Sequence, residues 1–226
     1  TSLTVGINPP EVVKERVELI VQNPEVKALK IKLGSQEGID YDKLIDSQVI
    51  ESTKNKDIAI RVDANGGWTL DEAKLMMKWL SERKAEYIEQ PLVEGDEDKL
   101  KFLFDGRPLP IFIDESCRFS EDVANHYQYV DGVNLKLMKC GGITEAIRIL
   151  NVAKSHGLKT MIGCMSESSV SISAGAAITG IIDYVDLDSH YNLDPDPSEG
   201  ASMVNGITMN SLLPGHGAKL KTENYA

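Results

Sequence analysis

Long apolar runs and targeting signals are the first features that the sequence lacks. No stretch of its 226 residues approaches the roughly 18 apolar residues of a membrane-spanning helix, so we expect no membrane partner. The opening TSLTVGINPP has neither the basic nor the apolar segment of a secretory signal peptide. It also has no initiator Met, which leads us to expect a segment of a longer chain.

An excess of positive charge is missing too, and cysteine is scarce. Lysine and arginine number 24 against 35 aspartates and glutamates, a net charge of -11, which argues against nucleic acid as a partner. The three cysteines, Cys117, Cys140 and Cys164, are an odd number without metal-ligand spacing. We therefore expect reduced thiols in a cytoplasmic protein. The oligomeric state is left open, with a homo-oligomer as one alternative.

What the sequence does contain is one period, repeated along the chain. Runs rich in β-branched residues alternate with helix-period segments such as 10–22, 69–84, 144–157 and 168–180. The predicted strands are 3–7, 28–33, 58–64, 85–91, 111–116, 132–138, 158–164 and 184–189. Strands that alternate with helices predict a parallel sheet, and this number of strands is typical of a (β/α)8-type barrel. A doubly wound open sheet is disfavoured because we find no Gly-rich nucleotide-binding turn.

The repeated pattern stops after the eighth predicted strand. The segment that follows includes PDPSEG and LLPGHG, which predict loops and short strands rather than an eighth full helix. We therefore expect a barrel domain over residues 1–190 and a C-terminal tail over residues 191–226.

Acidic residues occupy equivalent positions at the ends of consecutive predicted strands. They are Asp63, Glu89 and Asp114, separated by 26 and 25 residues, about one βα unit each. The carboxyl ends of barrel strands meet at one mouth, where three carboxylates would repel one another unless a cation lay between them. An all-carboxylate site suits Mg²⁺, with Mn²⁺ as an alternative, whereas zinc would require His or Cys.

Lysines occupy neighbouring strand ends. Lys30 and Lys32 are two residues apart, so their side chains point to one face of the strand. Two ammonium groups close together near a metal lower each other's pKa, which makes one of them a candidate base. Lys136 lies four strands further on and would face Lys32 across the mouth; Lys139 is an alternative for this role. Two bases on opposite faces of a carbon are what a racemase or epimerase requires. A metal bound to a substrate carboxylate would stabilise the charge that proton removal creates.

Taken together, these segments resemble a known family. KIK, RVDAN, YIEQPL, IDES, NLKLMKCGGITEA and GCMSES, in this order, resemble the enolase superfamily and, within it, the muconate-lactonizing-enzyme subgroup. The resemblance implies an α/β fold of the (β/α)7β TIM-barrel type. It also implies roles for the strand-end residues: Mg²⁺ ligands Asp63, Glu89 and Asp114, acid/base catalysts Lys32 and Lys136, and a contact of Lys30 with the substrate carboxylate.

The segment YVDLDS points to one branch of that superfamily. Its pair Asp186 and Asp188 resembles the D-x-D of L-Ala-D/L-Glu-type dipeptide epimerases, where the pair binds the free α-ammonium group of the substrate. This resemblance implies epimerisation of a dipeptide by 1,1-proton transfer at the α-carbon through an enolate. It also implies substrate contacts for Thr4, Met165 and Glu167. Ala-Glu is the family default as substrate, and the sequence does not specify the dipeptide.

One departure from the family concerns its N-terminal α+β capping domain, whose loops close over the barrel. Because this chain begins at the first predicted barrel strand, we expect that domain to be absent. The tail over residues 191–226 resembles the part that would return to it. The open alternatives are an N-acylamino-acid racemase or o-succinylbenzoate synthase of the same superfamily, and a non-catalytic barrel fragment that lacks its cap. Neither of the two enzymes would be expected to use an ammonium site.

Overall fold

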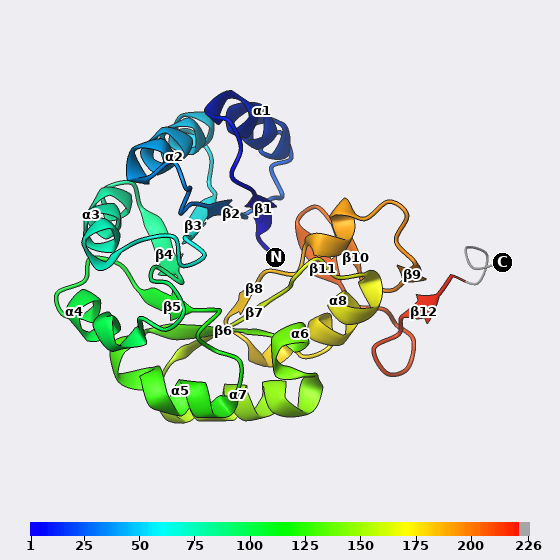
Figure 1. Cartoon of the computed structure of the whole chain (residues 1–226). Helices are drawn as coiled ribbons and strands as arrows, with labels where there is room; N and C mark the ends of the chain where they lie inside the picture. Colours follow the sequence, from blue (N-terminus) through cyan, green and yellow to red (C-terminus); the bar gives the residue numbers. More distant parts are fainter. Residues whose placement is uncertain (222–226) are drawn as a thin grey trace.

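A ring of parallel β-strands forms the centre of the protein (Figure 1). The computed structural model describes residues 1–221. Within them, eight strands pair in sequence order. They are β1 (Leu3–Val5), β2 (Ala28–Lys32), β3 (Ala59–Asp63), β4 (Ala85–Glu89), β5 (Ile111–Ile113), β6 (Gly132–Lys136), β7 (Lys159–Gly163) and β8 (Tyr184–Val185). The predicted barrel is confirmed, although each strand is shorter than the run that predicted it.

Helices cover the outside of this ring (Figure 1). They are α1 (Pro10–Ile20), α2 (Ile39–Thr53), α3 (Leu70–Ser81), α4 (Leu100–Phe104), α5 (Ser120–His126), α6 (Leu137–Cys140), α7 (Ile143–Ser155) and α8 (Ser169–Ala176). Short 3-10 turns are η1 (Glu97–Lys99), η2 (Tyr127–Tyr129), η3 (Thr179–Ile181) and η4 (Ser189–Asn192). In residues 1–221, none of these helices combines the length and apolarity needed to cross a bilayer.

Helix α3 illustrates why the sequence places helices here. The Thr69 hydroxyl accepts a hydrogen bond from the backbone of Glu72, and the Glu72 carboxylate accepts one from the backbone of Thr69, which together form a capping box. Its buried residues recur at helical spacing, so one face packs on the sheet: Ala73, Met76, Met77 and Leu80.

The interior of the ring contains an aromatic layer, made of Tyr87, Phe112, Met161 and Tyr184. The rings of Tyr87 and Phe112 lie 4.5 Å apart between centroids, and the Tyr87 hydroxyl lies 3.1 Å from the sulfur of Met161. Arg61 lies over the ring of Tyr184, 5.0 Å from its centroid. These side chains fill the amino-terminal half of the barrel and make it a packed core.

Strands β1 and β8 close the ring through a seam of few hydrogen bonds. The backbone N–H of Ser2 donates to the carbonyl of Val185 at 3.1 Å. Two residues after β8, the N–H of Leu187 donates to the hydroxyl of Thr1 at 2.8 Å rather than to a backbone carbonyl. The prediction that the eighth strand reaches residue 189 is therefore wrong. The N–H of Asp186 still donates to the carbonyl of Ile162 on β7, but toward β1 side-chain oxygens replace the backbone ladder beyond Val185.

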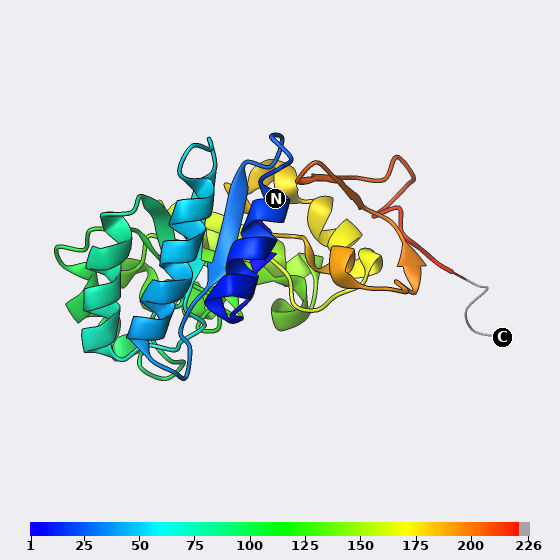
Figure 2. The ribbon, with the colours of Figure 1, turned by 90° about the horizontal axis from the view of Figure 1, so that it is seen from above.

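The segment after η4 lies beside the ring and extends away from it (Figure 2). It contains two antiparallel pairs, β10 (Ser202–Val204) with β11 (Ile207–Met209), and β12 (Lys219–Leu220) with β9 (Ser198–Glu199). The α-ammonium group of Thr1 donates to the carbonyl of Gly206 at 3.0 Å, which ties this segment to β1. The domain boundary at residue 190 stays a prediction, and residues 222–226 of the expected tail lie outside the described residues.

Candidate active site

Three fully buried carboxylates meet at the carboxyl ends of β3, β4 and β5. Asp63 and Glu89 are register partners in the sheet, and Asp114 directly follows β5. One ligand oxygen from each lies within 4.8 Å of the others. The structure therefore brings together the three acidic residues that the strand spacing singled out.

The electrostatics of this acidic triad favour a bound cation. Burial and the neighbouring carboxylate of Asp63 raise the pKa of Glu89 to about 8. Burial would also raise the pKa of Asp114, but Lys139 and Lys136 outweigh it and lower that pKa. A divalent ion between the three groups would remove the repulsion, and oxygen-only donors suit a hard cation. The triad could thus bind a metal ion.

Two lysines reach the triad from opposite sides. Lys32 on β2 places its Nζ 2.5 Å from Oδ2 of Asp63. Lys136 on β6 forms an ion pair with Oδ2 of Asp114. Because β2 and β6 are four strands apart in the ring, the two ammonium groups flank the space above the triad. Burial would lower the pKa of Lys136, but Asp114 and Glu89 raise it overall.

Lys30 lies deeper than Lys32 and is almost fully buried. Its Nζ forms an ion pair with Oδ2 of Asp186 and lies 3.5 Å from Glu89 and 3.6 Å from Asp63. Burial would lower the pKa of Lys30, yet these three carboxylates raise it well above its ordinary value. Without a metal ion, the nearest charged neighbours of Lys30 are carboxylates; the expectation that a metal and a neighbouring lysine lower the pKa of one lysine stays a prediction.

The D-x-D residues Asp186 and Asp188 follow β8 and are both buried. Oδ1 of Asp186 accepts a hydrogen bond from the Ser2 hydroxyl at 2.6 Å. Oδ2 of Asp188 accepts one from the backbone N–H of Thr4 at 2.7 Å. Burial would raise the pKa of Asp186, but Lys30 lowers it, whereas burial and Asp186 together raise the pKa of Asp188. Both carboxylates thus lie between β8 and β1.

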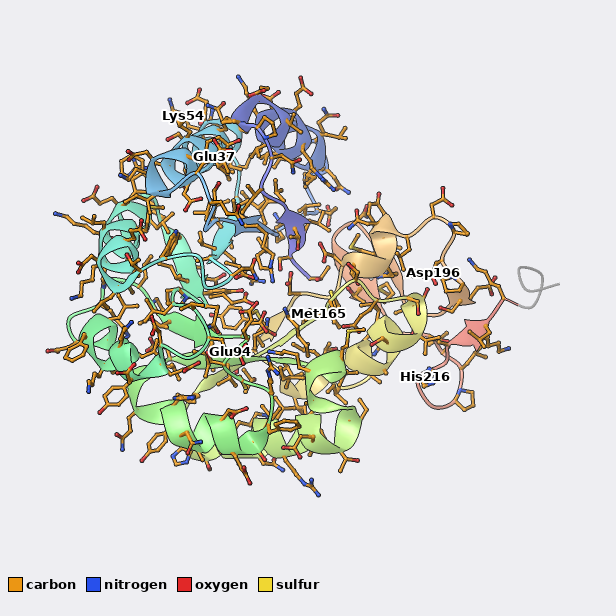
Figure 3. All side chains as sticks on the ribbon, in the orientation of Figure 1. Glu37, Lys54, Glu94, Met165, Asp196 and His216 are labelled. Carbon is orange, nitrogen blue, oxygen red and sulfur yellow. The ribbon has the colours of Figure 1, made fainter. Side chains whose placement is uncertain are left out.

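The loop after β7 carries the two remaining predicted contacts, Met165 and Glu167. Met165 lies within the ring in Figure 3, is 42% exposed, and has its sulfur 3.9 Å from Nζ of Lys136. Glu167 is buried, and its carboxylate accepts from the Met165 N–H at 2.8 Å and bonds the hydroxyl of Ser171. The carboxylate of Glu167 therefore stabilises, through these hydrogen bonds, the conformation of the loop that carries Met165.

Lys139, considered above as an alternative base, has a different place. Its Nζ contacts both the carboxylate and the carbonyl oxygen of Asp114, and it donates to the carbonyl of Asn134 at 3.0 Å. With these three acceptors around it, the ammonium group of Lys139 holds Asp114 in place. Lys136, by contrast, is the lysine that contacts Met165.

Sequence reasoning missed two buried amides that hold the triad. Asn134 donates through Nδ2 to Oε1 of Glu89 at 2.6 Å. Gln90 accepts through Oε1 from the backbone N–H of Asp114 at 2.8 Å. Asn134 lies two residues before Lys136 on β6, so strand periodicity would have placed it on the same face. Gln90 directly follows Glu89, and only the fold shows that it reaches across to the next strand.

A closed parallel ring with an acidic triad between two lysines at its carboxyl ends defines an α/β-barrel with a candidate metal-dependent active site. Residues 12–224 match the model of the family described as enolase C-terminal domain-like. The chain belongs to this family.

Relatives of known name are similar over almost the whole chain. A hydrophobic dipeptide epimerase of Flavobacteria bacterium (strain MS024-2A) is 64% identical over 226 residues, which are 100% of this chain and 65% of that protein. A hydrophobic dipeptide epimerase of Roseobacter litoralis is 60% identical over 220 residues, 97% of this chain and 64% of that protein. The chain thus spans about 65% of the length of the relatives it matches.

Solved structures show the same barrel. A dipeptide epimerase from Enterococcus faecalis V583, complexed with Mg and the dipeptide L-Leu-L-Tyr, superposes with a TM-score of 0.89 at 32% identity, covering 96% of this chain and 63% of that one. A dipeptide epimerase from Cytophaga hutchinsonii, complexed with Mg and D-Ala-L-Val, gives a TM-score of 0.91 at 27% identity, covering 99% and 62%.

Proposed function

We propose that this barrel carries the catalytic site of a Mg²⁺-dependent epimerase of hydrophobic dipeptides. The observation that carries the proposal is the placement of Lys32 and Lys136 on opposite sides of one acidic triad. Two proton-transfer groups on opposite faces of a carbon allow inversion, which a single base fixed on one face does not. The names of the relatives at 64% and 60% identity support the substrate class.

In this proposal the reaction is a 1,1-proton transfer at the α-carbon of the C-terminal residue of the dipeptide. The lysine on one face, in its neutral form, takes the α-proton onto Nζ, and the protonated lysine on the other face returns a proton to the carbon. Lys32 and Lys136 exchange these roles between the two epimers. Both have a carboxylate of the triad beside them, which fixes the direction of each side chain.

Asp63, Glu89 and Asp114 would hold the metal in this proposal. Their donor set fits Mg²⁺: three buried carboxylates, of which Glu89 has its pKa raised to about 8 by burial and by Asp63. A bound Mg²⁺ would stabilise the negative charge that develops on the substrate carboxylate. Asn134 and Gln90 keep two of these ligands in place through hydrogen bonds.

The two ends of the dipeptide would be bound by different groups. Lys30 supplies a buried cation for the substrate carboxylate, and the anionic pair Asp186 and Asp188 supplies the subsite for the α-ammonium group. Thr4 borders that subsite, and Met165 offers an apolar contact beside Lys136. Glu167 would act on the substrate through the loop that carries Met165.

The three cysteines of the chain are free thiols: Cys117, Cys140 and Cys164. They support the cytoplasmic setting predicted from the sequence, which we keep as part of the proposal.

Deuterium exchange tests the proposal directly. The chain would be incubated in deuterated water with Mg²⁺ and a panel of hydrophobic dipeptides, next to the N-acylated form of each C-terminal residue. We expect deuterium at the α-carbon and formation of the second epimer for free dipeptides only, and neither after chelation of the metal. Preferred exchange of the acylated compounds would favour a racemase of N-acylamino acids, and no exchange of any compound would favour a non-catalytic barrel.

A further inference from the structure

Asp42, in the first turn of α2, is a fully buried carboxylate on the outer side of the ring. Its Oδ2 accepts hydrogen bonds from the backbone N–H of Gly34 at 3.0 Å and from the indole N–H of Trp68 at 2.7 Å. Its Oδ1 accepts one from the backbone N–H of Ser35 at 3.0 Å. Hydrogen bonds to a carboxylate are among the strong ones in proteins. Asp42 therefore joins the loop after β2 to the loop after β3.

The same two loops also touch through a pair of glycines. A Cβ atom added to Gly67 would lie 2.5 Å from Cα of Gly34, and one added to Gly34 would overlap the carbonyl oxygen of Ala64. Gly34 has a φ of +81°, a conformation that glycine adopts without strain. Because the two backbones are in direct contact, one loop cannot move toward the other without displacing it.

Each loop directly follows a residue of the candidate site. Lys32 ends β2, two residues before Gly34, and Asp63 ends β3. The N–H of Leu33 donates to the carbonyl of Asp63 at 2.8 Å, and the N–H of Asn65 donates to Oδ1 of Asp63 at 2.8 Å. The placement of both loops therefore affects where the ammonium group of Lys32 meets the carboxylate of Asp63.

We infer that Asp42 is a positioning residue for proton transfer by Lys32. Its carboxylate holds the loops after β2 and β3 as one unit, and this unit places Nζ of Lys32 against the acidic triad. The inference rests on the proposed function, which it deepens by giving one of the two proton-transfer groups its own support. Lys136 lies four strands further on, outside this unit.

Asp46 offers a matched control on the same helix. It is only 2% exposed, and its Oδ2 accepts a hydrogen bond from the indole N–H of Trp79 at 2.9 Å. Arg83 lies 3.3 Å from the same oxygen. This carboxylate thus also binds a tryptophan, but its partners belong to α3 and the turn after it rather than to a loop at the barrel mouth.

Deuterium exchange at the tyrosine α-carbon of L-Leu-L-Tyr and L-Leu-D-Tyr tests the inference. Rates would be measured at saturating Mg²⁺, and Lys136→Ala identifies the epimer whose α-proton Lys32 removes. Asp42→Asn should slow exchange of that epimer by about 10- to 100-fold, and exchange of the other epimer by about 2-fold or less, because only one proton-transfer group is displaced. Asp46→Asn should slow neither. Slowing of both epimers alike or of neither in Asp42→Asn, or loss at the Lys32 epimer alone in Asp46→Asn, would overturn the inference.

Gly67→Ala disturbs the same unit without changing Asp42. The added methyl group would push against Gly34, and we expect slower exchange of the same epimer. Gly180→Ala is the matched control, because a methyl group there would meet no atom within 4 Å. Normal exchange of both epimers by a folded Gly67→Ala chain would contradict the inference.

A measurement without substrate keeps the inference separate from the proposed function. The ¹⁵Nζ NMR signal of Lys32, assigned with Lys32→Met, should shift in Asp42→Asn but not in Asp46→Asn. The signal of Lys136 should stay in place in both variants. An unchanged Lys32 signal in Asp42→Asn would overturn the inference even if the chain turned over no substrate. A shifted signal in a chain without turnover would support the inference and contradict only the proposed function.

Amide hydrogen exchange of the unmodified chain needs no variant. If one carboxylate holds both loops, the N–H groups of Gly34 and Ser35 and the indole N–H of Trp68 should become accessible together. We expect their protection factors to agree within about tenfold. Opening of one loop while the other stays protected would overturn the inference.

Discussion

Two layers of side chains fill the same ring of strands and are built in opposite ways. The aromatic layer is apolar and packed, with Tyr87 and Phe112 fully buried against each other. The charged layer lies two residues further along the strands and is made of Lys30, Asp63, Glu89, Asp114, Lys136 and Asp186. On β4 the step leads from Tyr87 to Glu89, and after β5 it leads from Phe112 to Asp114.

Within a single strand, the residues that stabilise the fold therefore differ from the residues that form the candidate active site. Burial of an aromatic side chain contributes to stability, whereas crowded carboxylates and ammonium groups lose hydration and repel their like neighbours. One barrel end can therefore tolerate an unfavourable arrangement because the other end is well packed. Residues two apart on one strand should then differ sharply in what their substitution changes.

The largest expected effect is in the charged layer. Lys136→Ala should lower epimerisation by about 10³-fold, within the range for a lost acid/base group, while Lys32 still exchanges the α-proton of one epimer. Proton NMR of both epimers in deuterated water would measure the two rates. Lys54→Ala, a change of an exposed residue after α2, is the matched control and should leave both rates unchanged. Normal epimerisation by Lys136→Ala would rule out the two-lysine mechanism.

The next effect is in the aromatic layer. Phe112→Ala should reduce the free energy of unfolding by about 3–5 kcal/mol, because it leaves a cavity between Tyr87 and Tyr184. Urea denaturation would measure the loss, and calorimetric titration should show Mg²⁺ affinity within a few-fold of the unmodified chain. If a folded Phe112→Ala chain no longer bound Mg²⁺, the two layers would not be separable.

A smaller effect should distinguish metal binding from folding. At a Mg²⁺ concentration of 100 times Kd, the ion should stabilise the unmodified chain by about 2.7 kcal/mol, and Glu89→Gln should lose most of this gain. Without Mg²⁺ the variant should be at least as stable as the unmodified chain at pH 7, because burial and Asp63 raise the pKa of Glu89 to about 8 and folding then requires this carboxyl to take up a proton. Thermal unfolding with Mg²⁺ and with a chelator would show both. Full stabilisation of Glu89→Gln by Mg²⁺ would count against the triad as the metal site.

The smallest effect lies outside both layers and serves as a reference. The hydroxyl and the N–H of Ser120 donate to Glu145 at 2.7 and 2.9 Å, and with Arg148 they lower the pKa of Glu145 from 4.5 to about 2. A depressed carboxyl pKa stabilises the fold above pH 4.5, and this contribution is lost as the pH falls from 4.5 toward 2. Urea unfolding between pH 3 and 6 should therefore show a stability difference between Glu145→Gln and the unmodified chain that shrinks at low pH. A constant difference would contradict this assignment.

The barrel and the members of the charged layer could be predicted from strand periodicity alone. Asp63, Glu89 and Asp114 recur at nearly one βα unit, and parallel strands carry such positions to one mouth. The opposite placement of Lys32 and Lys136 could be predicted from the order of the strands, since four strands separate opposite sides of an eight-stranded ring.

The pairing of these side chains could not be predicted in the same way. Periodicity gives the face to which Lys30 points, but its partner Asp186 is set by distances across the barrel. Likewise, Glu167 could have faced a substrate, and the hydrogen bonds that instead tie it to Met165 and Ser171 depend on the path of a loop. Such contacts depend on how strands and loops are placed in space, which residue types alone do not specify.

The seam between β1 and β8 has a consequence for the order in which the molecule forms during refolding. The acidic triad comes from three consecutive strands, so its ligands assemble from neighbouring segments of chain. The proposed ammonium subsite includes Asp186, whose contact with Ser2 joins residues 184 positions apart, and loop closure over such a span is slow. A refolding chain should therefore acquire the capacity to hold Mg²⁺ first, and the capacity to hold a dipeptide only when β1 and β8 have paired.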